Sequence, residues 1–227
     1  MRSIMILLPL FAILASAQAG TWIEDFNDGN LDGWKSAMSP ASAEWNIENG
    51  QLAARFKTVA GIGSTSSICM EPSEWKDYAV EASVWLTQKL GGHMEMGLGL
   101  RVDSTAGNGY MFILHYVDNH IQITKNTAFF TIEKLLVKPY ELSENTLYRM
   151  KCSVVGDHLS FYINDELCAE IDDSRFKRGT FGIYILNVHV IIDDIIITGD
   201  DIPDKGPSQT VDHRGKLATI WGKLRTE

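Results

Sequence analysis

Hydrophobic and polar residues alternate with a period of two in short runs along most of the chain, and Gly, Asn and Asp separate the runs. This alternation is typical of antiparallel β-strands that bury one face. No segment before residue 210 shows the hydrophobic spacing of a helix. The pattern predicts strands over residues 45–47, 51–56, 78–86, 94–102, 110–117, 121–125, 147–155, 158–163, 167–171, 180–186 and 188–198. Because these strands follow one another with no helices between them, they predict a single all-β domain, a sandwich or a barrel.

The same alternation assigns the faces of two predicted strands. Strand 78–86 has an apolar row on one face, which leaves Glu81 and Trp85 on the other. Strand 94–102 has an apolar row from Met94 to Val102, which leaves Glu95, Arg101 and two glycines opposite. Strand glycines often mark the close approach of another group to a sheet. If the two strands are neighbours, the four polar and aromatic side chains flank a patch that the glycines keep clear.

The last predicted strand has a different pattern. Residues 188–197 place apolar side chains on both faces. Such a strand is usually central and buried. An exposed apolar patch there would instead indicate a structural domain that binds a protein partner.

The beginning of the chain has the pattern of a secretory signal peptide. It combines Arg2, an apolar run over residues 4–14, and small residues at Ala17 and Ala19. The apolar run is shorter than the roughly 20 residues that span a bilayer. We therefore predict that residues 1–19 are removed, that the protein is exported to the periplasm or the extracellular space, and that the mature chain has no transmembrane segment.

The end of the chain is also distinct from the predicted domain, which covers residues 20–199. Residues 200–212 form a polar linker with two prolines. In residues 213–227, Leu217, Ile220, Trp221 and Leu224 recur at helical spacing and predict a short amphipathic helix with a local excess of basic residues. Three interpretations stay open: the helix folds back on the domain, docks onto a protein partner, or binds a membrane surface.

Composition narrows the class of ligand. The chain has 227 residues, 45% of them hydrophobic, and a formal net charge of -9 from 20 basic and 29 acidic residues. The acidic balance argues against a nucleic-acid partner, because phosphate backbones are bound by clustered Lys and Arg.

The chain has three cysteines, Cys69, Cys152 and Cys168. Their number is odd and they include no Cys-x-x-Cys pair, so we expect three free thiols. The six histidines are scattered without the spacing of a metal site, and we expect structural roles for them.

Motifs in both halves of the chain resemble those of one family. Residues 25–34 (DFNDGNLDGW) and 45–52 (WNIENGQL) are similar to the opening of secreted bacterial concanavalin A-like jelly rolls. This group includes laminin-G-like modules and the 3-keto-disaccharide hydrolase family. Residues 148–165, Asp173, Phe176, Gly179 and the stretch 192–195 (IDDI) resemble the closing half of the same fold. The resemblance extends over about residues 22–199 and implies a two-sheet antiparallel jelly roll.

The resemblance implies a carbohydrate ligand, because members of this fold commonly bind sugars on the concave sheet or along its rim. Glu81, Trp85, Glu95 and Arg101 are residue types that stack on sugar rings or hydrogen-bond to hydroxyls. We therefore expect a non-catalytic glycan-binding or adhesion module with these four residues as its site. The competing interpretation is that Trp85 caps a sheet edge and that the charged residues form a cross-strand ion-pair network without a ligand.

The resemblance also implies a calcium ion that joins the first and last strands in many relatives. Asp25 and Asp194 are the ligands that we expect for it, because Ca²⁺ prefers hard oxygen donors. Asp and Asn are, however, also common as turn formers.

An enzyme is the alternative function. The chain lacks the carboxylate motif of the β-glucanases and the Gly-x-Ser-x-Gly elbow of serine hydrolases. The resemblance to 3-keto-disaccharide hydrolases instead implies elimination followed by hydration of a 3-keto-glycoside. Such chemistry needs a base, for which Glu95 or His115 is the candidate, and an electrophile at the ketone oxygen, for which Arg101 is the candidate.

Overall fold

The structure is a computed structural model that describes residues 19–38, 43–56, 65–71, 74–103, 107–127, 132–204 and 206. All regular elements in this part of the chain are β-strands, as the alternation predicts. The predicted signal peptide and the predicted C-terminal helix lie outside the described residues, except for Ala19. Cleavage, export and the partner of the tail therefore stay predictions.

One layer of the fold is an eight-stranded antiparallel sheet. Seven of its strands follow the order β13-β12-β11-β6-β15-β4-β3, and β1 pairs with β15 beside this path. In chain order its strands are β1 (Gly20–Glu24), β3 (Ala43–Glu48), β4 (Gln51–Phe56), β6 (Tyr78–Lys89), β11 (Leu147–Val155), β12 (His158–Ile163), β13 (Glu166–Asp172) and β15 (Val188–Gly199). Strand β15 pairs with β6 on one side and with β4 and β1 on the other, so it is central, as its apolar residues predict.

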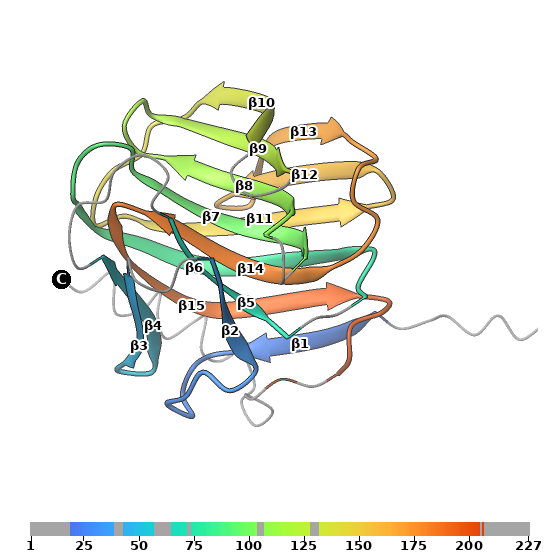
Figure 1. Cartoon of the computed structure of the whole chain (residues 1–227), viewed down its shortest axis with the longest axis horizontal. Coiled ribbons are helices and arrows are strands. Elements are labelled where there is room, and N and C mark those ends of the chain that lie inside the picture. Colours follow the sequence, from blue (N-terminus) through green and yellow to red (C-terminus); the bar gives the residue numbers. More distant parts are fainter. Residues whose placement is uncertain are drawn as a thin grey trace, which may run out of the picture.

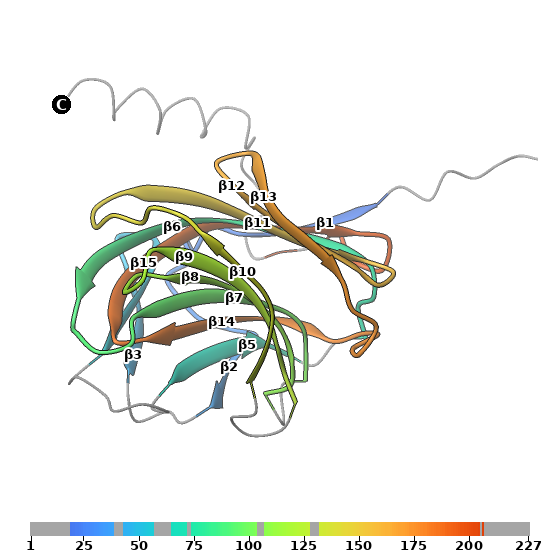
Figure 2. The same ribbon diagram turned by 90° about the horizontal axis from the view of Figure 1, so that it is seen from above.

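The second layer is a seven-stranded sheet with the order β10-β9-β8-β7-β14-β5-β2, and all its pairs are antiparallel. Its strands are β2 (Trp34–Met38), β5 (Ser66–Met70), β7 (Glu95–Val102), β8 (Gly109–His115), β9 (His120–Asn126), β10 (Ile132–Pro139) and β14 (Thr180–Leu186). Figure 1 views the molecule with this sheet in front, and Figure 2 shows the two layers from above. The predicted two-sheet sandwich is confirmed.

The core fills the space between the two sheets. Its largest fully buried side chains include Tyr78, Tyr110, Phe112, Phe161 and Phe181. The predicted apolar row of strand β6 points into this core, and Val80, Val84 and Leu86 are fully buried there. The three cysteines are buried and free, as predicted. Among the described residues there is no helix with the length and hydropathy that a membrane crossing requires.

Four strands, β1, β2, β5 and β10, were not predicted from the pattern. Strand β10 is a sheet edge with mostly exposed side chains and ends at Pro139, so its residues do not alternate clearly. Strands β1 and β5 do not bury alternate residues, and in β2 (WKSAM) polar and apolar residues do not alternate.

Candidate functional site

The structure does not bring the four predicted sugar-binding residues together. Strands β6 and β7 are consecutive in the chain but belong to different sheets. Glu81 and Trp85 alternate with core residues of β6, so they lie on the outer face of the eight-stranded sheet. Glu95 alternates with core residues of β7, on the outer face of the other sheet. The four residues therefore form neither the predicted patch nor the alternative network among Glu81, Glu95 and Arg101, and Glu81 instead forms an ion pair with Lys151 at 2.8 Å.

Arg101 has a structural position, contrary to its expected role as a ligand or an electrophile. Its backbone is in the left-handed region with φ 51°, next to a register shift between β7 and β14. The residue is only 2% exposed, and its guanidinium donates to the carbonyl oxygens of Lys76 and Phe176 and to the carboxylate of Asp77. The irregularity also changes which residues of β7 face the core. Val102 was predicted to continue the core row but belongs to an apolar cluster separate from the main core.

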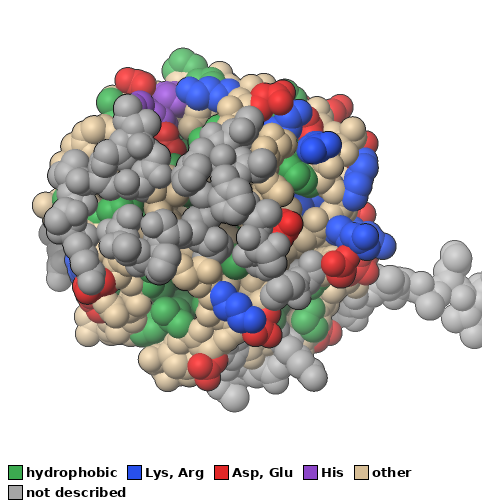
Figure 3. Space-filling view, in the orientation of Figure 1, with side chains coloured by type: hydrophobic (Ala, Val, Ile, Leu, Met, Phe, Trp, Pro, Cys, Tyr) green, Lys and Arg blue, Asp and Glu red, His purple; other side chains and the backbone are tan. Residues whose placement is uncertain are grey.

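The outer face of the seven-stranded sheet, referred to below as the front face, carries an unusual set of polar groups. Cross-strand pairing aligns Gln122, Ile113, Gly97, Tyr184 and Ser67 in one row across five strands. The next row contains Thr124, Met111, Gly99, Gly182 and Cys69. The polar side chains in these rows come from the three strands β5, β9 and β14, and Figure 3 shows the molecule from this side.

Several of these polar groups are buried and lack a hydrogen-bond partner. They are Ser67 Oγ, Gln122 Oε1 and Thr124 Oγ1, and Asn126 Oδ1 at the end of β9 is a further such atom. Gln122 is 3% exposed and Thr124 is fully buried. A buried polar atom without a partner costs about 1–3 kcal/mol, and such atoms are rare in native proteins. A water molecule or a ligand group at this face would remove that cost.

The sequence suggested that the two glycines of β7 keep a patch of the sheet clear. The structure shows that they do not. A Cβ atom at Gly97 would lie 3.0 Å from Ile113 Cγ1, and one at Gly99 would lie 2.9 Å from Met111 Sδ. Neighbouring side chains therefore lie over both glycines. Together with Val102, Tyr184 and Leu186 these side chains form an apolar cluster on the front face.

A small pocket lies beside this apolar cluster. Its lining includes Ser67, Cys69, Val102, Met111, Asn126 and Tyr184. Two of these residues, Ser67 and Asn126, carry polar atoms without a partner, whereas Val102 and Met111 are apolar. The pocket thus combines hydrogen-bonding groups with an apolar wall, and its volume of about 20 Å³ has room for one water molecule or one hydroxyl group of a ligand.

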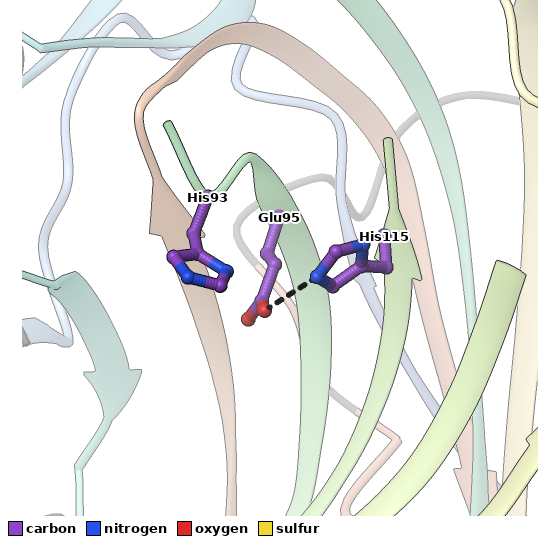
Figure 4. A group of neighbouring side chains, drawn as sticks. All are labelled: His93, Glu95 and His115. Carbon is purple, nitrogen blue, oxygen red and sulfur yellow. Dashed lines mark ion pairs between the residues drawn. The ribbon is translucent and has the colours of Figure 1, made fainter. Parts of the chain in front are cut away.

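Histidine and carboxylate groups gather at one end of the front face. Glu95 begins β7 and pairs directly with His115, the last residue of β8. His93 precedes β7 by two residues, and Figure 4 shows its ring and the His115 ring on either side of the Glu95 carboxylate. Glu95 Oε1 lies 3.4 Å from His115 Nε2. Histidines that are scattered along the sequence are thus brought together here by the fold.

Further groups surround this pair. His120 of β9 pairs with His115, and the two rings stack at 4.2 Å between centroids. Asp118 Oδ2 lies 3.8 Å from His115 Nδ1. The Tyr184 hydroxyl donates to Glu95 Oε2 at 2.8 Å. These contacts hold the Glu95 carboxylate and the His115 ring in fixed orientations.

Burial determines the electrostatics of this end. It raises the pKa of Glu95, and the Tyr184 hydrogen bond opposes that shift. It also lowers the pKa of both His115 and His120, because a charged imidazole loses hydration there. The neutral imidazole is thus favoured, with a nitrogen lone pair that can accept a proton or a metal ion.

The predicted calcium ligands, Asp25 and Asp194, lie at the paired strands β1 and β15. Among the described residues, no cluster of three or more carboxylate, histidine or cysteine groups that could hold a metal ion includes either of them. Strand β1 pairs with β15, so Asp25, next after β1, lies near the register irregularity at Asp193 and Asp194 within β15. Asp193 Oδ1 accepts from the backbone N–H of Asp194. The calcium ion stays a prediction.

Comparisons with known proteins agree with the fold. The family model described as "3-keto-alpha-glucoside-1,2-lyase-like domain" matches residues 21–198. The levanase of Bacillus subtilis (strain 168) is 25% identical over 154 residues, which are 66% of this chain and 22% of the levanase. The chain thus spans about a fifth of the length of that relative.

Two solved structures are similar at low sequence identity. The carbohydrate-binding module CBM66 from Bacillus subtilis has a TM-score of 0.61 and 19% identity, with 73% of this chain and 95% of the module covered. The winged bean acidic lectin, solved with methyl-alpha-D-galactose, has a TM-score of 0.54 and 11% identity, with 80% of this chain and 99% of the lectin covered. At these identities the likeness establishes the shared sandwich fold.

Proposed function

Because the chain belongs to the family of 3-keto-alpha-glucoside-1,2-lyase-like domains, we propose that it binds a saccharide on the front face, at the pocket between β5, β7, β8 and β14. The observation that carries this proposal is the set of buried polar atoms without partners on the same face. A fold shared with a carbohydrate-binding module and a lectin supports it.

The chemistry of the front face suits a sugar. Hydroxyl groups of a saccharide both donate and accept hydrogen bonds, so they can pair with Ser67 Oγ and Asn126 Oδ1, which belong to residues that line the pocket. The C–H faces of a sugar ring can pack on the apolar wall that Met111 and Val102 form. One ligand would thus satisfy the orphan polar atoms and cover apolar surface at the same time.

A glycan array probed with the protein, with and without Ca²⁺, identifies the ligand, and titration calorimetry then compares variants. Ser67→Ala removes an unpaired hydroxyl of a residue that lines the pocket. We expect it to leave folding stability unchanged or slightly higher, and to weaken sugar binding about tenfold, the effect of one hydrogen bond of roughly 1–1.5 kcal/mol.

Trp85→Ala is the matched control, because Trp85 lies on the outer face of the other sheet. We expect it to bind the sugar like the unaltered protein. If Trp85→Ala abolishes binding while Ser67→Ala has no effect, the site lies on the eight-stranded sheet and the present proposal is wrong.

Catalysis on a 3-keto-glycoside is a second candidate, favoured by the contact between Glu95 and His115. A ketone at C3 acidifies the C2–H bond, and a base that removes this proton allows a C1 leaving group to depart as a double bond forms between C1 and C2. Glu95 is the better placed base, because burial raises the pKa of its carboxyl and so strengthens it as a proton acceptor. Arg101 takes no part, since its guanidinium is used by Lys76, Phe176 and Asp77.

The test is release of the aglycone or reducing sugar from a 3-keto-glucoside. We expect loss of at least 100-fold in rate for Glu95→Gln, the lower range for a general base, and no change for Glu81→Gln on the opposite sheet. A pure protein that is inert on such substrates would exclude the catalytic candidate and leave saccharide binding untouched.

A further inference from the structure

We propose that His93, Glu95 and His115 bind a divalent transition-metal ion of the zinc type at the end of the front face. One ligand atom from each of these residues lies within 4.8 Å of the others. Two imidazoles and one carboxylate are the donor set that zinc and related ions prefer, whereas Ca²⁺ and Mg²⁺ prefer oxygen donors alone.

The fold explains why these three side chains meet. Glu95 and His115 are direct partners across the β7–β8 pair, so their side chains share one face. His93 lies two residues before Glu95 and therefore on the same side of the chain. Gly91 and Gly92, both with positive φ, form the turn that brings His93 to this position after β6. Figure 4 shows the carboxylate between the two rings.

Distances at the centre of the group fit a metal ion. Glu95 Oε1 and His115 Nε2 are 3.4 Å apart. Two ligands of a tetrahedral zinc ion, each bound at about 2.0–2.1 Å, are separated by about 3.3 Å. Only His93, which is exposed, must rotate to complete the set.

The surrounding residues supply the outer contacts that metal ligands usually have. The Tyr184 hydroxyl holds Glu95 Oε2 at 2.8 Å and leaves Oε1 directed at His115. His115 Nδ1 is buried without a hydrogen-bond partner and faces the Asp118 carboxylate at 3.8 Å. If Nε2 binds the ion, Nδ1 carries the ring proton and can donate it to Asp118, the arrangement of carboxylate, histidine and metal found at many zinc sites.

A second possible set, His115, Asp118 and His120, shares His115 with the first. One neutral imidazole binds a single ion, so the two sets compete. The first is favoured because Glu95 is 12% exposed and fixed by Tyr184, whereas Asp118 is 69% exposed. The nearby Lys134 opposes a cation, but its exposed ammonium is screened by solvent.

Three protein ligands leave at least one coordination position for a water molecule or for an oxygen of a bound ligand. On the proposed function, that ligand would be a hydroxyl or ketone oxygen of the saccharide. The metal site itself does not depend on that function, because it is tested without a sugar.

The test uses the full chain after dialysis against a chelator. Titration calorimetry with Zn²⁺, together with metal analysis after gel filtration, should give one ion per chain. Co²⁺ should produce the visible absorption of a nitrogen- and oxygen-ligated ion. We expect His93→Ala and Glu95→Gln each to weaken Zn²⁺ binding more than 100-fold, and Tyr184→Phe to weaken it about 10–100-fold.

His158→Ala is the matched control, because His158 is an exposed histidine that contacts two carboxylates, Asp172 and Glu170, on the other sheet. It should bind one ion with unchanged affinity. Loss of the ion in His120→Ala and Asp118→Asn but not in His93→Ala would assign the metal to the second set and overturn the proposal. So would Zn²⁺ binding that is unaffected by Glu95→Gln, or no binding by the unaltered protein.

Discussion

Glu95 and Arg101 illustrate how two charged residues of one strand acquire different roles. Both were expected on the same face of β7, in a site with residues of β6. Glu95 follows the alternation and reaches the front face, where it contacts His115 and Tyr184. Arg101 adopts a positive φ instead, and its side chain becomes almost completely buried. Alternation alone does not reveal such a change of phase, because it depends on the pairing with β14.

The contacts of Arg101 predict a large effect on stability. Its guanidinium donates three hydrogen bonds, at 2.8 Å to Lys76 O, 2.7 Å to Phe176 O and 3.1 Å to Asp77 Oδ1. Hydrogen bonds of charged groups contribute about 1.5–3 kcal/mol each, and the two carbonyl groups would lose their partner. We expect Arg101→Ala to lower the free energy of unfolding by about 3–5 kcal/mol in urea denaturation.

Arg149→Ala provides the comparison for that variant, since Arg149 makes an ion pair at 3.3 Å with an exposed Asp165. Its loss should stay below about 1 kcal/mol. Equal losses for the two arginines would show that the burial of Arg101 contributes nothing to the stability of the fold.

At the scale of elements, the sequence predicted most strands and the all-β class but not the membership of the sheets. Strands β7, β8 and β9 were each predicted. The contact between His115 and Glu95 requires the register of the β7–β8 pair, which alternation does not supply. The predicted sugar-binding patch required β6 and β7 to be neighbours. The sequence has no signal that the chain crosses from one sheet to the other between these two strands.

The close packing over β7 leads to a prediction for Gly97. A Cβ atom there would lie 3.0 Å from Ile113 Cγ1 and 3.1 Å from the Phe112 carbonyl oxygen. The carbonyl group belongs to the β-ladder and cannot move away, and Ile113 is stiff at χ1. We expect Gly97→Ala to lower the free energy of unfolding by about 1–3 kcal/mol, measured by urea denaturation.

Ser83→Ala serves as the control, because Ser83 lies on the outer face of β6 in the other sheet and the change adds no atoms. A loss below about 0.5 kcal/mol is the usual effect at such a surface position. If Gly97→Ala proves as stable as the unaltered protein, Ile113 has more freedom on the front face than its packing indicates.

At the scale of the whole molecule, the fold is closed where β1 pairs with β15, the first and last strands. This junction buries acidic groups: Glu24 is 1% exposed and Asp25 is 4% exposed. The sequence suggested that acidic residues meet here, but β1 was not predicted, so their burial could not be foreseen. Burial disfavours the charged form of Glu24, and stability therefore depends on pH.

Glu24 determines the direction of this dependence. Burial raises the pKa of its carboxyl to about 7, although the Phe26 N–H and the Trp34 side chain hydrogen-bond to it and oppose the shift. Between the unfolded pKa of about 4.5 and the folded value, the folded state retains a proton that the unfolded state has lost. The free energy of unfolding therefore falls as the pH rises through this range, by up to about 3 kcal/mol, and stays at the lower level above it.

Urea denaturation at pH values from 4.5 to 8 measures this fall, and Glu24→Gln identifies its source. The amide keeps the size of the side chain and cannot ionise, so the variant should match the unaltered protein near pH 4.5 and exceed its stability at pH 8. Part of the slope should persist in the variant, because burial also raises the pKa of Asp193 to about 6. If the pH profile of the variant runs parallel to that of the unaltered protein, the slope belongs to Asp193 and its neighbours. If stability rises with pH in both proteins, a bound cation neutralises the junction carboxylates.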